Sequence, residues 1–267
     1  MSGEKPLRAD EPRNATEQVS GGETGLGAES VRAEESVRAE ESVQAEESVQ
    51  AEESLQAEER FDIYDELDRP IGTATRSEAH ALGLWHHTFH CWLARSGEDG
   101  RTRVLFQRRS RDKDTNPDRF DITAAGHLSA GETVRDAVRE LEEELGLRVS
   151  LEDLAPLGTF REEDEGFAQG VRYIDREVSE VYGYIADRGP ETFRLQREEL
   201  AGLYEADAEA LLALMRGEAE TVTAGGAELD ANGVLVPVYE VAVRLSDFVA
   251  RDTAYYIRVI EALMRLL

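Results

Sequence analysis

Three glutamates near the middle of the chain have a spacing that suits metal binding. Glu140, Glu143 and Glu144 stand at positions i, i+3 and i+4, so their carboxylates converge if the segment is helical. Like charges at this spacing destabilise an isolated helix by roughly 0.2–0.5 kcal/mol per pair. A hard divalent cation such as Mg²⁺ or Mn²⁺ reverses this repulsion because it prefers oxygen ligands. The alternative interpretation is an acidic helix face that is simply solvated.

A loop with two glycines precedes these glutamates. The segment Gly126-His-Leu-Ser-Ala-Gly-Glu132 lets backbone groups approach a phosphate or a metal closely, because glycine has no side chain. A helix is predicted over 133–145, where Thr133 and Asp136 have the spacing of a capping box and Gly146 stands where a C-terminal cap belongs. The apolar residues on one face of this helix are Val134, Ala137, Val138, Leu141 and Leu145.

These motifs resemble the box of the Nudix hydrolases. Gly126-x5-Glu132, followed by Arg139-Glu-Leu-Glu-Glu-Glu-Leu-Gly-Leu147, is similar to the family pattern Gly-x5-Glu-x7-Arg-Glu-U-x-Glu-Glu-x-Gly-U, in which U is aliphatic. The second half matches at every fixed position, but six residues instead of seven separate Glu132 from Arg139. The box is therefore 22 residues long, and the shortening falls where the loop joins the helix.

Further motifs resemble a Nudix branch related to isopentenyl-diphosphate isomerase, over residues 60–250. They are Leu84-Trp-His-His-Thr-Phe-His90, Gln107-Arg-Arg-Ser-x2-Lys113, Pro117-x2-Phe-Asp121 and Ala125-Gly-His127. The resemblance implies an α/β (α+β) fold in which a mixed β-sheet is sandwiched between helices. It also implies that Glu140, Glu143 and Glu144 hold Mg²⁺ or Mn²⁺. A further acid from a later strand usually joins them, for which Glu177 is our first candidate and Glu180 the second.

Such a site could hydrolyse a diphosphate linkage in a nucleoside diphosphate derivative or a related organic diphosphate. Metal ions neutralise phosphate charge and lower the pKa of an attacking water. A carboxylate that is free of the metal would act as the base, and Glu143, Glu144 and Glu177 are the candidates for the catalytic roles.

A compact basic cluster could hold the diphosphate. Arg108, Arg109 and Lys113 are suited to phosphate oxygens, arginine as a bidentate donor and lysine as a point charge. Their alternative role is pairing with surface acids. Arg139 is expected to fix a glutamate through a salt bridge and to take no part in the chemistry.

The histidines raise the prospect of a second cation. Four of the five lie between His80 and His90, and the fifth is His127. In the isomerase, histidines at positions resembling His86 and His127 bind a metal together with glutamates, which implies a site here for zinc or manganese. The alternative interpretation places His80 and His87 in solvent, His90 in a strand and His127 against its loop.

Two alternatives to a hydrolase stay open: an isopentenyl-diphosphate Delta-isomerase, and a Nudix-fold module that binds a ligand without turnover. In the isomerase, a Cys-Gly-His loop supplies one half of the proton-transferring pair, and a glutamate resembling Glu177 supplies the other. This chain has Ala125 in place of that cysteine, and a methyl group cannot exchange a proton. Its single cysteine, Cys91, is expected to be a buried strand residue. A pure binding module has no need of three converging glutamates.

Strands and helices interleave through the body of the chain. The alternation of apolar and polar residues predicts strands at 61–64, 88–94, 104–107, 120–124, 157–161 and 178–185. A polar turn is expected at 68–72. Two further helices are predicted near 207–216 and 246–266.

The N-terminal quarter of the chain has a different composition. Residues 1–59 contain 16 acidic residues, 5 basic residues and no aromatic residue, so they cannot bury enough apolar surface to fold. A hexapeptide repeat over 28–59 places valine or leucine at every sixth position, which turns successive apolar residues by about 120° on a helix and forms no stripe. We predict a disordered acidic tail over 1–59 and a Nudix domain with C-terminal helices over 60–267.

The overall composition limits the partners and the compartment. The 267 residues have a net charge of −27, which argues against a nucleic-acid polymer or an anionic membrane as the partner. One cysteine excludes an intramolecular disulfide and a four-cysteine zinc site. The sequence has no long apolar run and no secretory pattern at its start. We therefore expect a cytoplasmic protein that acts on a small-molecule diphosphate, and a homodimer is left open.

Overall fold

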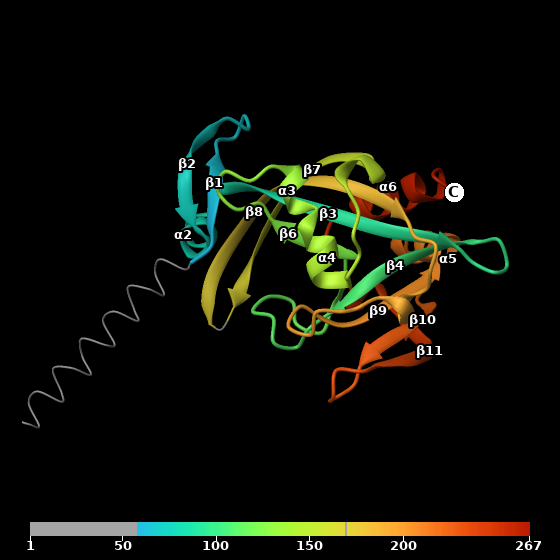
Figure 1. The fold of residues 1–267 in the computed structure, drawn as a ribbon. Coiled ribbons are helices and arrows are strands. Elements are labelled where there is room, and N and C mark those ends of the chain that lie inside the picture. The colour runs from blue at the N-terminus through green and yellow to red at the C-terminus, as the bar shows by residue number, and fades with distance from the viewer. Residues whose placement is uncertain (1–57, 169) are drawn as a thin grey trace, which may run out of the picture. The chain divides into compact units, whose positions relative to one another are not determined.

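The computed structural model describes residues 58–168 and 170–267, so most of the predicted tail and its repeat lie outside the described residues. The described chain is organised around one large mixed sheet (Figure 1). Its strands are β1 (Arg60–Tyr64), β2 (Pro70–Thr75), β3 (Trp85–Ser96), β4 (Thr102–Arg109), β5 (Phe120–Asp121), β6 (Ala124–His127), β7 (Ala155–Ala168), β8 (Val171–Ile185), β9 (Leu200–Asp207), β10 (Val222–Leu229) and β11 (Leu235–Val243).

Strand β3 is the centre of this sheet. Along one edge it pairs in parallel with β8, from His86 opposite Glu177 to Ala94 opposite Ile185. Along the other edge it pairs in turn with β1, β6 and β4. One strand therefore connects the predicted histidine motif, the glycine loop at the start of the box, and the strand that carries Glu177.

Helices cover both faces of the sheet, as predicted (Figure 1). Phe89, Cys91 and Leu93 point to one face and pack with the apolar side of the box helix. Trp92 and Ala94 point to the other face and pack with the C-terminal helices. The helices are α2 (Arg76–Leu82), α3 (Val134–Ala137), α4 (Arg139–Leu145), α5 (Ala208–Met215) and α6 (Thr253–Met264).

The face of β3 that carries Trp92 changes character toward the start of the strand. Side chains alternate between the two faces of a strand, so His86, Thr88 and His90 point to the same side as Trp92. All three are buried. Polar residues therefore replace apolar ones toward the start of β3, and Thr88 and His90 line the candidate site.

The predicted box helix forms in two pieces. Thr133 and Asp136 make the capping box at the start of α3, and Gly146 ends α4 in the left-handed conformation with φ 65°. Val138 lies between the two pieces. The interruption thus falls within the spacer that is one residue shorter than the family pattern.

Several predicted boundaries were wrong. The turn expected at 68–72 lies earlier, because the Asp65 carboxylate accepts the backbone N–H groups of Leu67 and Arg69. Pro70 already belongs to β2. Helix α6 begins only at Thr253, because the Asp252 side chain caps it by accepting the Ala254 N–H at 2.9 Å.

The segment before that cap has a different role from the helix predicted there. It contains a short 3₁₀ turn, Leu245–Asp247, and then a stretch without helix or strand over 249–252 that lines the cavity described below. None of the helices in the described parts of the chain is long and apolar enough to cross a membrane.

Candidate active site

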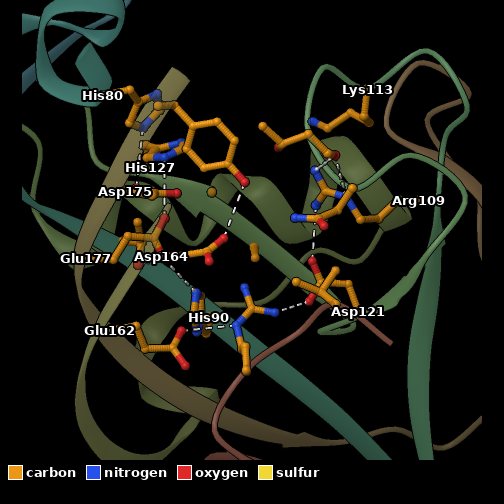
Figure 2. A pocket seen from close by; sticks show the side chains of 18 of the residues that line it. His80, His90, Arg109, Lys113, Asp121, His127, Glu162, Asp164, Asp175 and Glu177 are labelled. Atoms are coloured by element: carbon orange, nitrogen blue, oxygen red, sulfur yellow. Dashed lines mark hydrogen bonds and ion pairs between the residues drawn. The ribbon is translucent and has the colours of Figure 1, made fainter. Parts of the chain in front are cut away.

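A cavity of about 670 Å³ lies over the polar surface of β3 (Figure 2). Most of the residues in its wall are charged. The carboxylates in it include Glu140, Glu144, Glu162, Asp175, Glu177 and Glu199. The cationic side chains in it include Arg76, Arg109, Lys113, Arg161 and Arg251.

Two of the three box glutamates face this cavity. Glu144 is 3% exposed, its Oε2 atom has no hydrogen-bond partner among the described residues, and burial raises its pKa well above the usual value. Glu140 is also largely buried, and burial raises its pKa to about 7 although Arg139 opposes the shift. The Glu143 side chain is 53% exposed and does not line the cavity.

The loop at the start of the box is shaped to receive Glu140. A Cβ atom built on Gly126 would lie 2.5 Å from the Cδ atom of Glu140, which is closer than atoms can approach. Glycine at this position therefore lets the β6 backbone lie directly against the box carboxylate. Arg139 also fixes this carboxylate, as expected, with Nη2 at 3.2 Å from Oε1, and pairs with Glu132 at 3.1 Å.

Three histidines from three different elements converge beside the cavity. His80 comes from α2, His86 from β3 and His127 from β6, and one ring nitrogen of each lies within 4.8 Å of the others. His86, Asp175 and Glu177 form a second group with the same closeness. The predicted pair of His86 and His127 is thus brought together, with His80 and Asp175 added.

The histidine cluster has the properties of a cation site. The Nδ1 atom of His86 lies 2.9 Å from the Leu84 carbonyl oxygen, so this nitrogen donates its hydrogen and the Nε2 lone pair stays free. Burial lowers the pKa of His86, lowers that of His80 to about 4, and lowers that of His127 well below its usual value. Neutral imidazole is the form that binds a metal.

Atoms in this cluster lack the hydrogen bonds that buried polar groups normally make. Among the described residues, the Nε2 atoms of His80, His86 and His127 and the Oδ1 atom of Asp175 have no partner. Nitrogen and oxygen donors of this kind suit zinc or manganese. The donor set therefore fits the second cation that the resemblance implies.

The parallel pairing of β8 with β3 places Glu177 opposite His86. Its Oε1 atom is 3.5 Å from His127 Nε2 and its Oε2 atom is 3.9 Å from His90 Nε2 (Figure 2). Burial raises the pKa of Glu177 well above the usual value, and the nearby Asp175 carboxylate adds to the shift. The second candidate, Glu180, does not line the cavity and instead accepts a hydrogen bond from Thr159.

The basic cluster is divided by the fold. Lys113 lines the cavity, where it pairs with Glu199. Arg109 also lines it, with Nη1 at 3.1 Å from Asp121 Oδ2. Arg108 does not line the cavity, and its guanidinium pairs with acidic side chains on β10 and in the loop before β5.

Sequence reasoning missed several residues of the site. Asp175 stands two positions before Glu177, so strand alternation could have placed both on one face. Glu199 precedes a strand that was not predicted. Arg251 comes from the segment just before α6, where its Nε atom lies 3.0 Å from Glu162 and another nitrogen pairs with Asp121. No local pattern in the sequence indicates these partners.

The chain is similar to several known proteins. An uncharacterized Nudix hydrolase of Clostridium acetobutylicum is 38% identical over 203 residues, which cover 76% of this chain and 96% of that protein. Nudix hydrolase 3 of Arabidopsis thaliana is 34% identical over 54% of this chain, but this region is 18% of that protein. An isopentenyl-diphosphate Delta-isomerase of Pectobacterium atrosepticum is 30% identical over 48% of this chain and 67% of its own length.

A solved structure and a family model also match. A crystal structure from Deinococcus radiodurans shares 23% sequence identity, with a TM-score of 0.44, over 60% of this chain and 90% of that one. The family model described as the NUDIX domain matches residues 84–224, which is more than half of the 267 residues. Together with the first relative, which is matched along almost its whole length, this match shows that the chain belongs to the Nudix hydrolase family.

Proposed function

We propose that the protein is a Mg²⁺- or Mn²⁺-dependent hydrolase of a diphosphate linkage in a nucleoside diphosphate derivative or a related organic diphosphate. The observation that carries the proposal is the buried carboxylate of Glu144, whose Oε2 atom has no hydrogen-bond partner among the described residues, beside Glu140 in a charged cavity. An uncompensated buried charge destabilises a fold by several kcal/mol. A site that keeps such a group is expected to receive a cation.

The residues present fit the cation that the family implies. Glu140 and Glu144 would hold Mg²⁺ or Mn²⁺ through carboxylate oxygens, the ligands that these ions prefer. The histidine cluster with Asp175 would hold a second cation. When bound, such ions neutralise phosphate charge and lower the pKa of a bound water.

The chain's own residues supply the remaining functions. Lys113 and Arg109 face the cavity and would bind the diphosphate oxygens, Lys113 by exchanging Glu199 for phosphate. Glu177 is our candidate for the base that receives the proton of the attacking water. Glu143 was predicted to share the metal and the catalysis, but its exposed position beside Arg139 makes it the weakest of the three box glutamates for either role.

The wall of the cavity favours a polar substrate. Among the residues that the structure describes, Ala125, Val249 and Ala250 are its aliphatic side chains, and Tyr173 is its one phenol or phenyl ring. An isoprenoid tail needs an apolar enclosure, because its burial among charges gains little from the hydrophobic effect. A phosphate ester of a sugar or nucleoside has hydroxyl and phosphate oxygens that can form hydrogen bonds and ion pairs with these charged groups.

The isomerase alternative lacks its acid. Ala125 lines the cavity, and Cys91 lies on the opposite face of β3, fully buried in the core under α4. Burial also raises the pKa of the Cys91 thiol, so it is not a substitute proton donor. We expect no conversion of isopentenyl to dimethylallyl diphosphate above a control without enzyme. Product formation above that control would contradict the proposal, and trace isomerisation by Ala125→Cys would support it.

A metal-dependent phosphate-release screen tests the proposal. The full chain would be assayed against ADP-ribose, nucleoside diphosphates, nucleoside diphosphate sugars, dinucleoside polyphosphates and isopentenyl diphosphate, with Mg²⁺, with Mn²⁺ and with EDTA. We expect metal-dependent hydrolysis of at least one polar diphosphate and none in EDTA. If the folded protein binds Mn²⁺ and hydrolyses nothing in this panel, the binding-module alternative replaces the hydrolase.

A further inference from the structure

We propose that His90 is a positioning residue for Glu177, and that Tyr255 and Trp92 set the tautomer of its imidazole. In this arrangement the Nε2–H group of His90 donates to Oε2 of Glu177 and leaves Oε1 directed at the histidine cluster. The inference rests on the proposed function, because that proposal gives Glu177 its place in the reaction.

The imidazole of His90 is held from behind by α6. Its Nδ1 atom lies 3.0 Å from the hydroxyl oxygen of Tyr255, and the indole Nε1 of Trp92 lies 2.9 Å from the same oxygen. All three side chains are almost fully buried. The ring of His90 therefore has a fixed orientation, with its opposite edge toward the cavity.

The hydrogen-bond chemistry of these three groups selects one tautomer. The indole of Trp92 can only donate, so the Tyr255 oxygen accepts from it. The hydroxyl hydrogen of Tyr255 is then available to Nδ1 of His90 at 3.0 Å. Because a buried hydroxyl normally donates its hydrogen, we assign Nδ1 as the acceptor. Burial lowers the pKa of His90 to about 3, in agreement with a neutral ring. The single ring hydrogen is therefore on Nε2.

The Nε2–H group of His90 faces the candidate base. The Nε2 atom is 3.9 Å from Oε2 of Glu177, while Oε1 of the same carboxylate is 3.5 Å from His127 Nε2. Both distances exceed a normal hydrogen bond, and such contacts at active sites often shorten when the ligand binds. The two oxygens of Glu177 thus have different neighbours, and His90 is the neighbour of the oxygen that points away from the histidine cluster.

A purely structural role does not account for this placement. His90 lines the cavity and stands opposite Ala125 in the pairing of β3 with β6, where the small methyl group leaves the ring edge open. A core histidine satisfied only by Tyr255 would have apolar contacts at its second nitrogen. Here that nitrogen faces a carboxylate (Figure 2). The tautomer also excludes His90 as a general base, because its free nitrogen carries a hydrogen.

The tautomer can be observed without turnover. Long-range ¹H–¹⁵N correlation spectra of the full chain, recorded at pH 7 in EDTA, report which nitrogen of each histidine is protonated, and loss of a signal in His90→Gln assigns His90. We expect one Nε2-protonated tautomer in the wild type and a mixture in Tyr255→Phe. A hydrogen on Nδ1 in the wild type, or no change in Tyr255→Phe, would overturn the inference.

Kinetics test the positioning itself. With Mn²⁺ and the best substrate of the panel, His90→Leu should lower kcat about 10- to 100-fold, the range typical of partners that orient a reacting group, with little change in KM. His90→Gln should recover most of kcat, because its amide N–H can occupy the place of Nε2–H. Wild-type kcat in His90→Leu, or equal losses in both folded variants, would overturn the inference.

A neighbouring histidine gives the matched control. His87 lies on the same strand, points to the other face and bonds Asp68 at 2.8 Å, so His87→Leu should keep the kcat of the wild type. The two proposals fail in different ways. A wild type that hydrolyses nothing contradicts the proposed function and leaves the spectra to decide on the tautomer. An active wild type with an unaffected His90→Leu contradicts the inference alone.

Discussion

The three box glutamates are alike in sequence and different in the folded protein. Each helical residue turns by about 100°, so Glu140 and Glu144 lie about 40° apart around α4, whereas Glu143 is turned about 60° to the other side of Glu140. The apolar contacts of Leu141 and Leu145 with the sheet then decide which carboxylates are buried. The sequence could predict the cluster of three, but the choice between them depends on how the helix is rotated against β6.

This rotation predicts unequal effects of substitution. Glu144→Gln should reduce kcat by orders of magnitude and keep the folded structure, because it removes a carboxylate that a cation needs. Glu143→Gln should have an effect at least about tenfold smaller, since its side chain is exposed. Glu142→Gln is the matched control on the same helix, as Glu142 pairs with Arg148 at 2.6 Å outside the cavity. Steady-state kinetics of the three variants, with circular dichroism for folding, would check the order. Equal activity of Glu144→Gln and the wild type would remove the metal role of the box.

Glu140 should make the stability of the metal-free protein depend on pH. Burial raises its folded pKa to about 7 from an ordinary value of 4.5, with Arg139 opposing and Glu143, Glu199 and Glu59 adding to the shift. An acid whose pKa is raised in the folded state contributes stability that is fully present below its unfolded pKa. For Glu140 this contribution is present below pH 4.5 and is lost as the pH rises through 7. The free energy of unfolding of the wild type, relative to that of Glu140→Gln, should therefore fall by roughly 2 kcal/mol between pH 4.5 and 8.

Urea unfolding in EDTA at several pH values measures this difference directly. The comparison with Glu140→Gln cancels titrating groups that do not interact with Glu140, such as the histidines, whose lowered pKa values have the opposite sign. It includes the effect of the Glu140 charge on the pKa of Glu144. Mn²⁺ at pH 8 should stabilise the wild type and have a smaller effect on the variant. A pH-independent difference would show that Glu140 is ionised normally in the folded protein.

At the scale of elements, local patterns identified most of β3 and β8 and the box helix, and missed helix α2 and the strands β2, β9, β10 and β11. Strand β10 contains Gly225 and Gly226, which in a sequence indicate a turn. The structure shows another reason for Gly226, since a Cβ atom there would lie 2.2 Å from the carbonyl oxygen of Leu203 on β9. The glycine allows two backbones to approach closely. That requirement belongs to strand pairing and has no local signal.

The same kind of contact between β6 and α4 gives a prediction. In Gly126→Ala, the new methyl group must displace Glu140, because the Cβ position lies 2.5 Å from its Cδ atom. The moved atoms are the end of a flexible side chain, so we expect a fall in Tm of no more than a few degrees. Mn²⁺ affinity at the box, measured by calorimetry, should fall at least about tenfold, in the range seen when a ligand's supporting contact is lost. Unchanged affinity in a folded Gly126→Ala protein would mean that Glu140 is not a ligand.

At the scale of the whole molecule, the cavity depends on long-range assembly. Its lining runs from Glu59 to Asp252, and Asp121 lies between Arg109 and Arg251 although the two arginines are far apart in sequence. Sequence patterns locate motifs one at a time, so they indicated the box, the histidines and Glu177. The partners that complete these motifs follow from the topology of the sheet, in which β3 contacts β6 and β8 on its two edges.

The N-terminal boundary of the folded domain can be tested by truncation. Composition predicts that the acidic repeat contributes nothing to folding, whereas Glu58 and Glu59 have defined contacts. Glu58 accepts the Ser77 N–H at 2.9 Å, which satisfies a free donor at the start of α2, and Glu59 pairs with Arg76 at 2.9 Å.

A chain that starts at Glu58 should keep the Tm and kcat of the full chain. A chain that starts at Arg60 loses both contacts, worth about 1 kcal/mol at a helix start, and its Tm should fall by about 2–4 °C. Thermal unfolding of the three chains separates these cases. A drop of several degrees for the chain that starts at Glu58 would show that the repeat docks on the domain, in contradiction to its composition.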